Sequence, residues 1–190
     1  MKAIALNGSP HKGGNTNTLL TKVLEPIAEA GIETELIHIG CQALRGCIGC
    51  FRCKNTTPPQ CVIDNDKMNE YIEKMFAADA IIIGSPTYFA SVTAETKALL
   101  DRVGFVARMN GNPLKRKIGA AVSAVRRGGA VPTVDTINHM FQIQQMIVPG
   151  STYWNFGVGL MPGDVEGDDE GIANMQDLGE TIAWLLQKLR

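Results

Sequence analysis

The chain has 190 residues, a formal net charge of −1, and 45% hydrophobic and 19% charged residues. A chain of this length forms one domain as a rule and buries a sizeable core without disulfide staples. The balanced charge excludes the strongly basic surface of nucleic-acid-binding domains, and the hydrophobic content excludes wholesale disorder. No apolar run approaches the ~20 residues that span a bilayer, and the N-terminus lacks the features of a secretory signal. We therefore expect a cytoplasmic protein with no membrane or nucleic-acid partner.

Short apolar segments alternate with segments of helical periodicity along almost the whole chain. The strands are expected over residues 2–6, 34–39, 80–83, 118–122 and within 148–156. The helices are expected over residues 16–30, 66–76, 93–106, 132–146 and 172–189. Five strand–helix units without a linker predict one α/β domain over residues 1–190, with an irregular cysteine-rich excursion at about 41–64. The predicted architecture is a doubly wound, five-stranded parallel sheet with helices on both faces.

This topology predicts where a ligand would bind. In doubly wound sheets the ligand lies beyond the carboxyl ends of the strands, where the strand order reverses. The loops after the first, third and fourth strands should therefore carry the chemistry, and they are rich in Gly, Ser, Pro and Asn.

The loop after the first strand, over residues 8–18, is rich in turn residues and polar donors. It enters a helix, and the free N–H groups and dipole of a helix N-terminus favour a bound phosphate. The loop has neither the Gly-Lys-Ser/Thr ending of an ATP/GTP P-loop nor the Gly-x-Gly-x-x-Gly of a dinucleotide site. The side chains suited to a phosphate are Ser9, Asn15, Thr16 and Thr18 as polar donors and His11 and Lys12 as positive charges. The alternative is an ordinary helix cap by Asn15 or Thr16.

The loop after the third strand, over residues 84–92, places two aromatic side chains beside a proline. Tyr88 or Phe89 could stack on a flat ring system, and the backbone amides of Thr87, Tyr88 and Phe89 could bond its polar edge. An aromatic pair that simply packs in the core is the alternative.

Five cysteines lie within 21 residues, at positions 41, 47, 50, 53 and 61. An odd number in a reducing compartment argues against a disulfide framework and for metal or redox chemistry. The spacing Cys47-x2-Cys50-x2-Cys53-x7-Cys61 provides four thiols, the ligand number of an iron–sulfur cluster. Thiols without a cluster, a zinc site and a redox disulfide stay open as alternatives. Cys41 lies outside the spacing and is expected to be a free thiol.

Three motifs together resemble the flavodoxin-like NADPH-dependent FMN reductases, and within them the iron–sulfur flavoproteins. They are Gly-Ser-Pro-x-Lys-Gly-Gly-Asn-Thr over residues 8–16, Gly-Ser-Pro-Thr-Tyr-Phe over 84–89 and Lys-Ala-Leu-Leu-Asp-Arg over 97–102. The resemblance covers residues 1–150. It implies a flavodoxin-like fold, non-covalent FMN, and a homodimer or homotetramer in which a neighbouring subunit completes the flavin site.

The resemblance also implies the cofactor-binding residues. The FMN phosphate would be held by Ser9, His11, Asn15 and Thr16, and the isoalloxazine would be lined by Pro86, Thr87, Tyr88 and Phe89. The loop over residues 124–129, with Arg126 and Gly128, corresponds to a third flavin-side loop. Arg126 would stabilise reduced flavin or meet a nicotinamide phosphate, and a solvated turn is its alternative. The iron–sulfur flavoproteins carry a compact cysteine motif of this kind, whereas relatives without a cluster keep a cysteine-rich loop here.

We therefore expect an FMN-binding oxidoreductase, in which the flavin carries the redox chemistry and no acid–base residue is required. The expected activity is that of an NAD(P)H-dependent FMN or quinone-type reductase, with a [4Fe–4S] cluster on the four cysteines left open. The alternative is an iron–sulfur flavoprotein electron carrier that accepts single electrons from a ferredoxin-like partner and does not use NAD(P)H. A redox sensor with reactive thiols is a third hypothesis.

Overall fold

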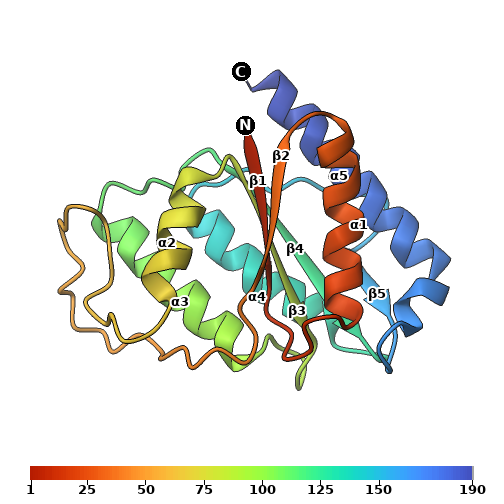
Figure 1. Cartoon of the computed structure of the whole chain (residues 1–190), viewed down its shortest axis with the longest axis horizontal. Coiled ribbons are helices and arrows are strands. Elements are labelled where there is room, and N and C mark those ends of the chain that lie inside the picture. Colours follow the sequence, from red (N-terminus) through yellow and green to blue (C-terminus); the bar gives the residue numbers. More distant parts are fainter. Residues whose placement is uncertain (190) are drawn as a thin grey trace.

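The computed structural model describes residues 1–189. Its centre is a five-stranded parallel sheet with the strand order β2-β1-β3-β4-β5 (Figure 1). The strands are β1 (Lys2–Asn7), β2 (Glu33–His38), β3 (Ala80–Pro86), β4 (Ile118–Val125) and β5 (Phe156–Val158). The helices are α1 (Asn15–Glu29), α2 (Met68–Ala77), α3 (Ala94–Met109), α4 (Ala130–Ile143) and α5 (Asp169–Lys188), with the short 3-10 helix η1 (Asp164–Gly167) before α5. This arrangement confirms the predicted doubly wound α/β fold.

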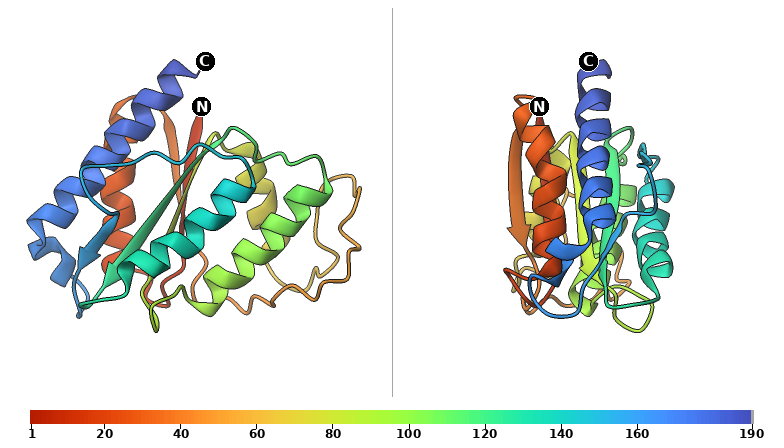
Figure 2. Two further views of the ribbon diagram at one scale, coloured as in Figure 1. Left: turned by 180° about the vertical axis from the view of Figure 1, so that it is seen from behind. Right: turned by 90° about the vertical axis from the view of Figure 1, so that its right-hand side faces the viewer.

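Alternate residues of the central strands face two separate hydrophobic cores. On β1, Ile4 and Leu6 pack into one core, and Ala3 and Ala5 pack into the other. Helices α2, α3 and α4 cover the first face, and α1 and α5 lie side by side on the second (Figures 1 and 2). Because both faces are covered, β3 and β4 are almost continuously buried, as a central strand of a parallel sheet requires.

The last strand lies later in the chain than the sequence predicted. The region 148–156 contains apolar and aromatic residues, but Pro149 and Gly150 interrupt it, and the isolated bridge to Ile118 is formed by Ile147, one residue before the region. The strand β5 begins at Phe156 and pairs with the end of β4 over three residues. This shift moves the loop after β5 to the carboxyl end of the sheet.

The loops after β1 and β3 are locked together at the start of α3. The N-cap Thr93 donates its hydroxyl to Gly8 O at 2.8 Å, and its N–H donates to Ser85 Oγ at 3.0 Å. A Cβ at Gly8 would lie 1.9 Å from Thr96 Oγ1, so only glycine allows α3 to approach the end of β1 this closely.

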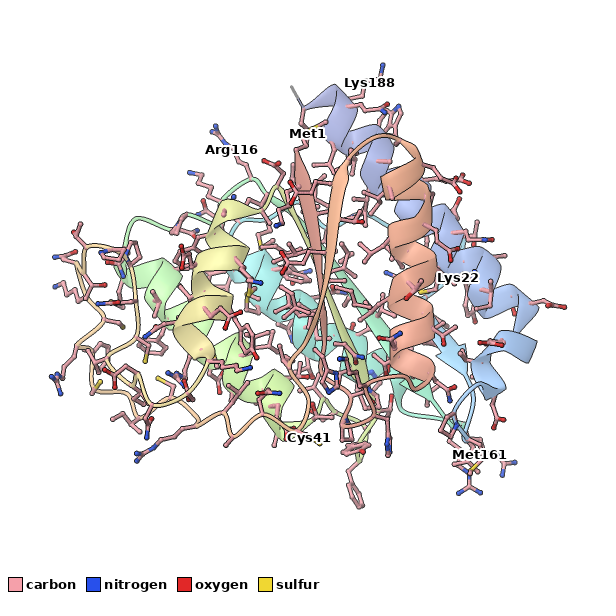
Figure 3. All side chains as sticks on the ribbon, viewed as in Figure 1. Met1, Lys22, Cys41, Arg116, Met161 and Lys188 are labelled. Atoms are coloured by element: carbon pink, nitrogen blue, oxygen red, sulfur yellow. The ribbon has the colours of Figure 1, made fainter. Side chains whose placement is uncertain are left out.

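The two ends of the sheet differ in composition and role. Cys41 and Met161 lie at the carboxyl end, whereas Met1, Arg116 and Lys188 lie at the opposite end (Figure 3). No helix within residues 1–189 is long and apolar enough to cross a lipid bilayer.

Candidate functional site

A cavity of about 500 Å³ opens at the carboxyl ends of the strands. We call it the carboxyl-end cavity; its lining residues are Ser9, His11, Gly14, Asn15, Thr16, Pro86, Thr87, Tyr88, Ala124, Arg126, Gly159, Leu160, Met161 and Pro162. The lining comes from the loops after β1, β3, β4 and β5, as the switch-point rule for doubly wound sheets requires. Its volume is in the range of cofactor sites, roughly 300–1,000 Å³.

The N-terminus of α1 faces this cavity without a side-chain cap. Gly14 is the N-cap residue, and the first turn of the helix holds no acidic residue. Within residues 1–189, the backbone N–H groups of Gly13, Asn15 and Thr16 have no protein acceptor. Uncapped N–H groups at the positive end of a helix dipole fit the phosphate of a bound nucleotide such as FMN.

The predicted phosphate-loop residues separate into two groups. Ser9, His11, Asn15 and Thr16 line the cavity, and Ser9 and Thr16 are buried. Their companions Lys12 and Thr18 are absent from the lining.

Lys12 is exposed, and its charge acts on His38 instead. Burial, and then the charge of Lys12, lower the pKa of His38, so the His38 imidazole is neutral at pH 7. Lys12 therefore adds positive potential beside the phosphate loop without being part of the cavity wall.

The side chain of Asn15 has a structural partner that its position in the sequence does not reveal. Its Oδ1 accepts the N–H of Gly163 at 2.9 Å, across 148 residues of sequence. Asp164 stabilises the loop after β5, because its Oδ2 accepts the N–H groups of Leu160 and Met161 at 3.1 and 2.7 Å. These bonds hold the loop over residues 159–162 against the cavity, where sequence reasoning placed no site residue.

The loop after β3 presents only part of its predicted surface to the cavity. Pro86, Thr87 and Tyr88 line it, whereas Phe89 is fully exposed and sits with Ala90 at the tip of a tight turn with positive φ. The N–H of Thr87 donates to Ala124 O and that of Tyr88 to Ser91 O, both at 2.8 Å. Two of the three amides predicted to meet the flavin edge are therefore already engaged within the protein.

In the loop after β4, Arg126 lines the cavity and Gly128 is exposed away from it. The glycine that the backbone requires is the next one, Gly129, whose φ is +90°. A Cβ on Gly129 would lie 3.1 Å from Ala90 Cα, so this glycine lets the loops after β3 and β4 pack together.

The cysteine-bearing segment is held to α2 and α3 by polar side chains. Asn69 pairs with the backbone of Cys61 in both directions, at 2.8 and 2.9 Å. Asn110 donates to Cys53 O at 2.7 Å and accepts the N–H of Thr56 at 2.9 Å. The two cysteines nearest the protein core are thus fixed through their main chains.

Cys47, Cys50, Cys53 and Cys61 all line one mainly apolar cavity beside α3. Cys53 is buried, Cys61 is half-buried and the other two are exposed. Burial, and then the nearby thiols of the other three, raise the pKa of the Cys53 thiol. The four cysteines of the predicted spacing therefore lie around one cavity. Cys41 lies elsewhere, and its thiol donates to Pro10 O.

The donor set of this cavity is four cysteine thiols. Within residues 1–189, no three His, Cys, Asp or Glu side chains converge closely enough to hold one metal ion such as zinc. A [4Fe–4S] cluster takes four thiolates on four separate irons, so its ligands lie farther apart than those of one ion. The four thiols match that requirement in number and type, around a small cavity of about 20 Å³.

Comparisons with known proteins agree with this geometry. The family model for NADPH-dependent FMN reductase matches residues 1–160. The chain is 40% identical to an iron-sulfur flavoprotein of Methanocaldococcus jannaschii, with both chains covered completely. It is 37% identical to the iron-sulfur flavoprotein of Methanosarcina thermophila, over 100% of this chain and 95% of that protein.

A solved structure shows the same fold at much lower identity. The WrbA-like flavodoxin from Agrobacterium tumefaciens superposes with a TM-score of 0.70 at 13% identity, over 100% of this chain and 99% of that one. The match of the family model to most of the chain, with full-length relatives at up to 40% identity, shows the family. The chain therefore belongs to the NADPH-dependent FMN reductase family, a family of flavoprotein oxidoreductases.

Proposed function

We propose that the protein binds FMN non-covalently in the carboxyl-end cavity and transfers electrons through it. The observation that carries this proposal is the uncapped N-terminus of α1, which faces a cavity of cofactor size. Bound FMN supplies hydride and single-electron chemistry at its isoalloxazine ring.

The lining residues have distinct roles in this proposal. The phosphate receives the N–H groups of Asn15 and Thr16, with the hydroxyls of Ser9 and Thr16 as further donors. Ser9 Oγ accepts the N–H of His11 at 3.1 Å, so its own proton is free for a phosphate oxygen. Pro86, Thr87 and Tyr88 line the isoalloxazine, and Tyr88 offers a flat apolar face.

Arg126 is the one arginine in the cavity wall and lies on the loop after β4. Its guanidinium stabilises negative charge that develops on the flavin, because opposite charges attract more strongly beside an apolar wall than in water. The same cation is placed to meet the phosphate of a nicotinamide nucleotide.

The four clustered cysteines hold a [4Fe–4S] cluster in this proposal. The support is their common cavity, the number and type of the ligands, and the printed name of the two full-length relatives, iron-sulfur flavoprotein. The function we favour is therefore that of an electron carrier, which exchanges single electrons with a ferredoxin-like partner through the cluster.

A second candidate is an NAD(P)H-dependent FMN or quinone-type reductase. The family description names NADPH, and Arg126 provides a cation at the mouth of the flavin site. In this case the flavin takes two electrons at once from the nicotinamide, and the cysteines are not needed for turnover.

One anaerobic experiment separates the two candidates. The purified protein is assayed for flavin, iron and acid-labile sulfide, and then mixed separately with NADPH and with reduced ferredoxin. About four irons per chain and flavin reduction only by ferredoxin support the carrier. Rapid flavin reduction by NADPH, unchanged in Cys50→Ser, supports the reductase. Protein that binds no FMN, even after FMN is added, contradicts both.

The chain also assembles as a homodimer or homotetramer in this proposal. The supporting feature is a second cavity of about 520 Å³ between α3 and α4, whose rim includes the partly exposed apolar side chains of Phe105 and Ile143. Apolar surface of this kind on a globular chain marks an interaction site.

A further inference from the structure

Arg102 on α3 is the largest fully buried side chain of the protein, and it lies beside the four clustered cysteines. Its guanidinium ties together both ends of the cysteine-bearing segment. Nη1 donates to Arg45 O at 3.1 Å and pairs with the carboxylate of Asp66, and Nη2 donates to Ile63 O at 2.8 Å. Two nitrogens of the guanidinium thus account for the structural role of this residue.

The third nitrogen is left without a partner. The Nε of Arg102 is buried, and no acceptor bonds it within residues 1–189. An unmade hydrogen bond from a buried donor destabilises the folded state, and the cost is larger for a charged group. A donor left unpaired beside two well-bonded nitrogens of the same group is suited to an acceptor that the protein chain does not itself supply.

The surroundings of Nε identify the kind of acceptor. Arg102 and the four cysteines line the same cavity, together with apolar side chains that include Phe105 and Val106. Among the side chains of that lining only the cysteine sulfurs are acceptors, and a cluster held by them would add its sulfides. Hydrogen bonds to such sulfurs are among the factors that set cluster reduction potentials.

We propose that the Nε–H of Arg102 donates a hydrogen bond to a sulfur of the cluster or of its cysteine ligands, and so raises the reduction potential of the cluster. This inference rests on the proposed binding of a [4Fe–4S] cluster by Cys47, Cys50, Cys53 and Cys61. Arg102 would keep its proton on Nε throughout, and its hydrogen bond would strengthen as one added electron made the sulfurs more negative. Arg102 is a positioning and tuning residue and carries no electron itself.

The charge of Arg102 does not by itself account for the raised reduction potential of the cluster, because the adjacent carboxylate of Asp66 neutralises that charge. The carboxylate of Asp66 is 4% exposed and the Arg102 side chain is 0% exposed, so solvent does not separate the pair. Lysine at position 102 would keep the positive charge but remove the Nε–H, which makes Arg102→Lys the informative variant.

The test is a redox titration of the anaerobic, cluster-loaded protein, followed by electron paramagnetic resonance for the cluster and by absorbance for the flavin. Arg102→Lys should lower the ratio of reduced to oxidised cluster at a fixed potential by at least about threefold. That change corresponds to about 28 mV, from about 59 mV per tenfold for one electron. The flavin potential should stay at its wild-type value.

The matched control is Arg108→Lys, which changes an exposed arginine on the same helix. Its Nη1 bonds only to Ile143 O, at 3.3 Å, and it is absent from the lining of the cysteine cavity. The control should leave both potentials unchanged. A purely structural role of Arg102 would lower the iron content of Arg102→Lys without shifting the potential of the cluster that remains.

A measurement on the wild-type chain decides the matter if Arg102→Lys fails to fold. Arginine labelled with ¹⁵N at Nε should give a ¹⁵N hyperfine coupling to the reduced cluster. The coupling should persist in Arg52→Lys, which removes the exposed arginine between Cys50 and Cys53. Protein that takes up no iron and sulfide on reconstitution overturns both this inference and the proposed cluster. Protein that holds its cluster but shows no ¹⁵N coupling, or the same potential in Arg102→Lys, overturns the role of Arg102 alone.

Discussion

At the scale of single residues, Asp66 and Arg102 form a buried ion pair. Burial opposes the ionisation of Asp66, but hydrogen bonds from Arg102 and from the backbone N–H groups of Arg45 and Met68 outweigh it and hold the pKa of Asp66 below its ordinary value. The ionised carboxylate therefore stabilises the folded state at neutral pH. This stabilisation is present above the ordinary carboxyl pKa and is lost as the pH falls through the lower folded-state pKa.

We predict that Asp66→Asn lowers the free energy of unfolding at pH 7 by about 3–5 kcal/mol, the usual effect of removing one partner from a buried ion pair. The difference from wild type should shrink as the pH falls below about 4, the ordinary carboxyl value, and it should disappear only below the lower folded-state pKa of Asp66. Urea unfolding between pH 3 and pH 8 measures both effects. The exposed Asp64→Asn is the control, and equal losses in the two variants would contradict the prediction.

At the phosphate loop, Asn15→Asp should weaken FMN binding about 10- to 100-fold. The new carboxylate would lie beside the site proposed for the phosphate, and like charges at close range repel by about 1–3 kcal/mol. Fluorescence titration of the apoprotein with FMN measures the change. Gln187→Glu adds the same charge at the exposed far end of α5 and should bind FMN as wild type does. An FMN affinity equal to that of the wild type in Asn15→Asp would show that the phosphate does not bind at this loop.

Two neighbouring arginines allow a paired test of the flavin electrostatics. Arg126 lines the carboxyl-end cavity, and Arg127 is exposed outside the lining. Arg126→Gln should lower the two-electron reduction potential of bound FMN, since a cation that favours the reduced flavin is lost. Arg127→Gln should leave that potential in place. A spectroelectrochemical titration distinguishes the two, and equal shifts would assign the effect to net charge alone.

At the scale of elements, the site depends on how the loops after the strands pack against one another. Gly129 begins α4 in a left-handed conformation and contacts the tight turn after β3. The loop after β5 is held in turn by Asn15 at the start of α1. The loops that line the carboxyl-end cavity thus hold one another in place, and we expect a local change in one loop to move the loop that it contacts.

Gly129→Ala should therefore lower both stability and FMN affinity. A side chain at positive φ costs on the order of 1–2 kcal/mol, and the new Cβ would also push against Ala90. Gly128→Ala adds the same methyl group one residue earlier, where no atom lies within 4 Å, and should have little effect. Thermal unfolding with and without FMN measures both variants. Equal behaviour of the two would show that the packing of these loops does not shape the cavity.

At the scale of the whole molecule, the two proposed redox sites lie apart, one at the end of the sheet and the other beside α3. The carboxyl-end cavity lies beyond the ends of the strands, near the first residue of α3. The cysteine cavity lies farther along α3, at Arg102 and Phe105, which at 1.5 Å per residue is roughly 12–17 Å from Ala94. A larger assembly would bring surfaces near the cysteines against other copies of the chain.

Light scattering should therefore report a homodimer or homotetramer. Ile143→Lys places a charge on an exposed apolar residue of the cavity between α3 and α4, and it should shift the protein toward the monomer. Leu189→Lys, at an equally exposed apolar residue outside that cavity, is the matched control. A monomeric wild-type chain would contradict the proposed assembly.

Several features could be predicted from sequence because their signals are local. The apolar run at 80–83 predicts a central strand, and β3 is buried on both faces because helices cover both sides of the sheet. The sequence predicts a helix that begins at Thr93, and in the structure Thr93 is the N-cap of α3. The strand β5 was misplaced because only three of its residues pair, too few for a recognisable alternation, and the loop over 159–162 was missed with it.

The sequence by itself determined the order of strands and helices along the chain, the glycine-rich loop after β1 and the cysteine spacing, since each is encoded within a short stretch of chain. Tertiary structure alone decided that Asn15 bonds a loop 148 residues away and that Phe89 turns outward. It also decided that Arg102 clamps a segment 36–57 residues earlier, with Nε left free beside the cysteines. The physical reason is that hydrogen-bond partners and burial depend on which segments the sheet brings together, and no local pattern of residues records that.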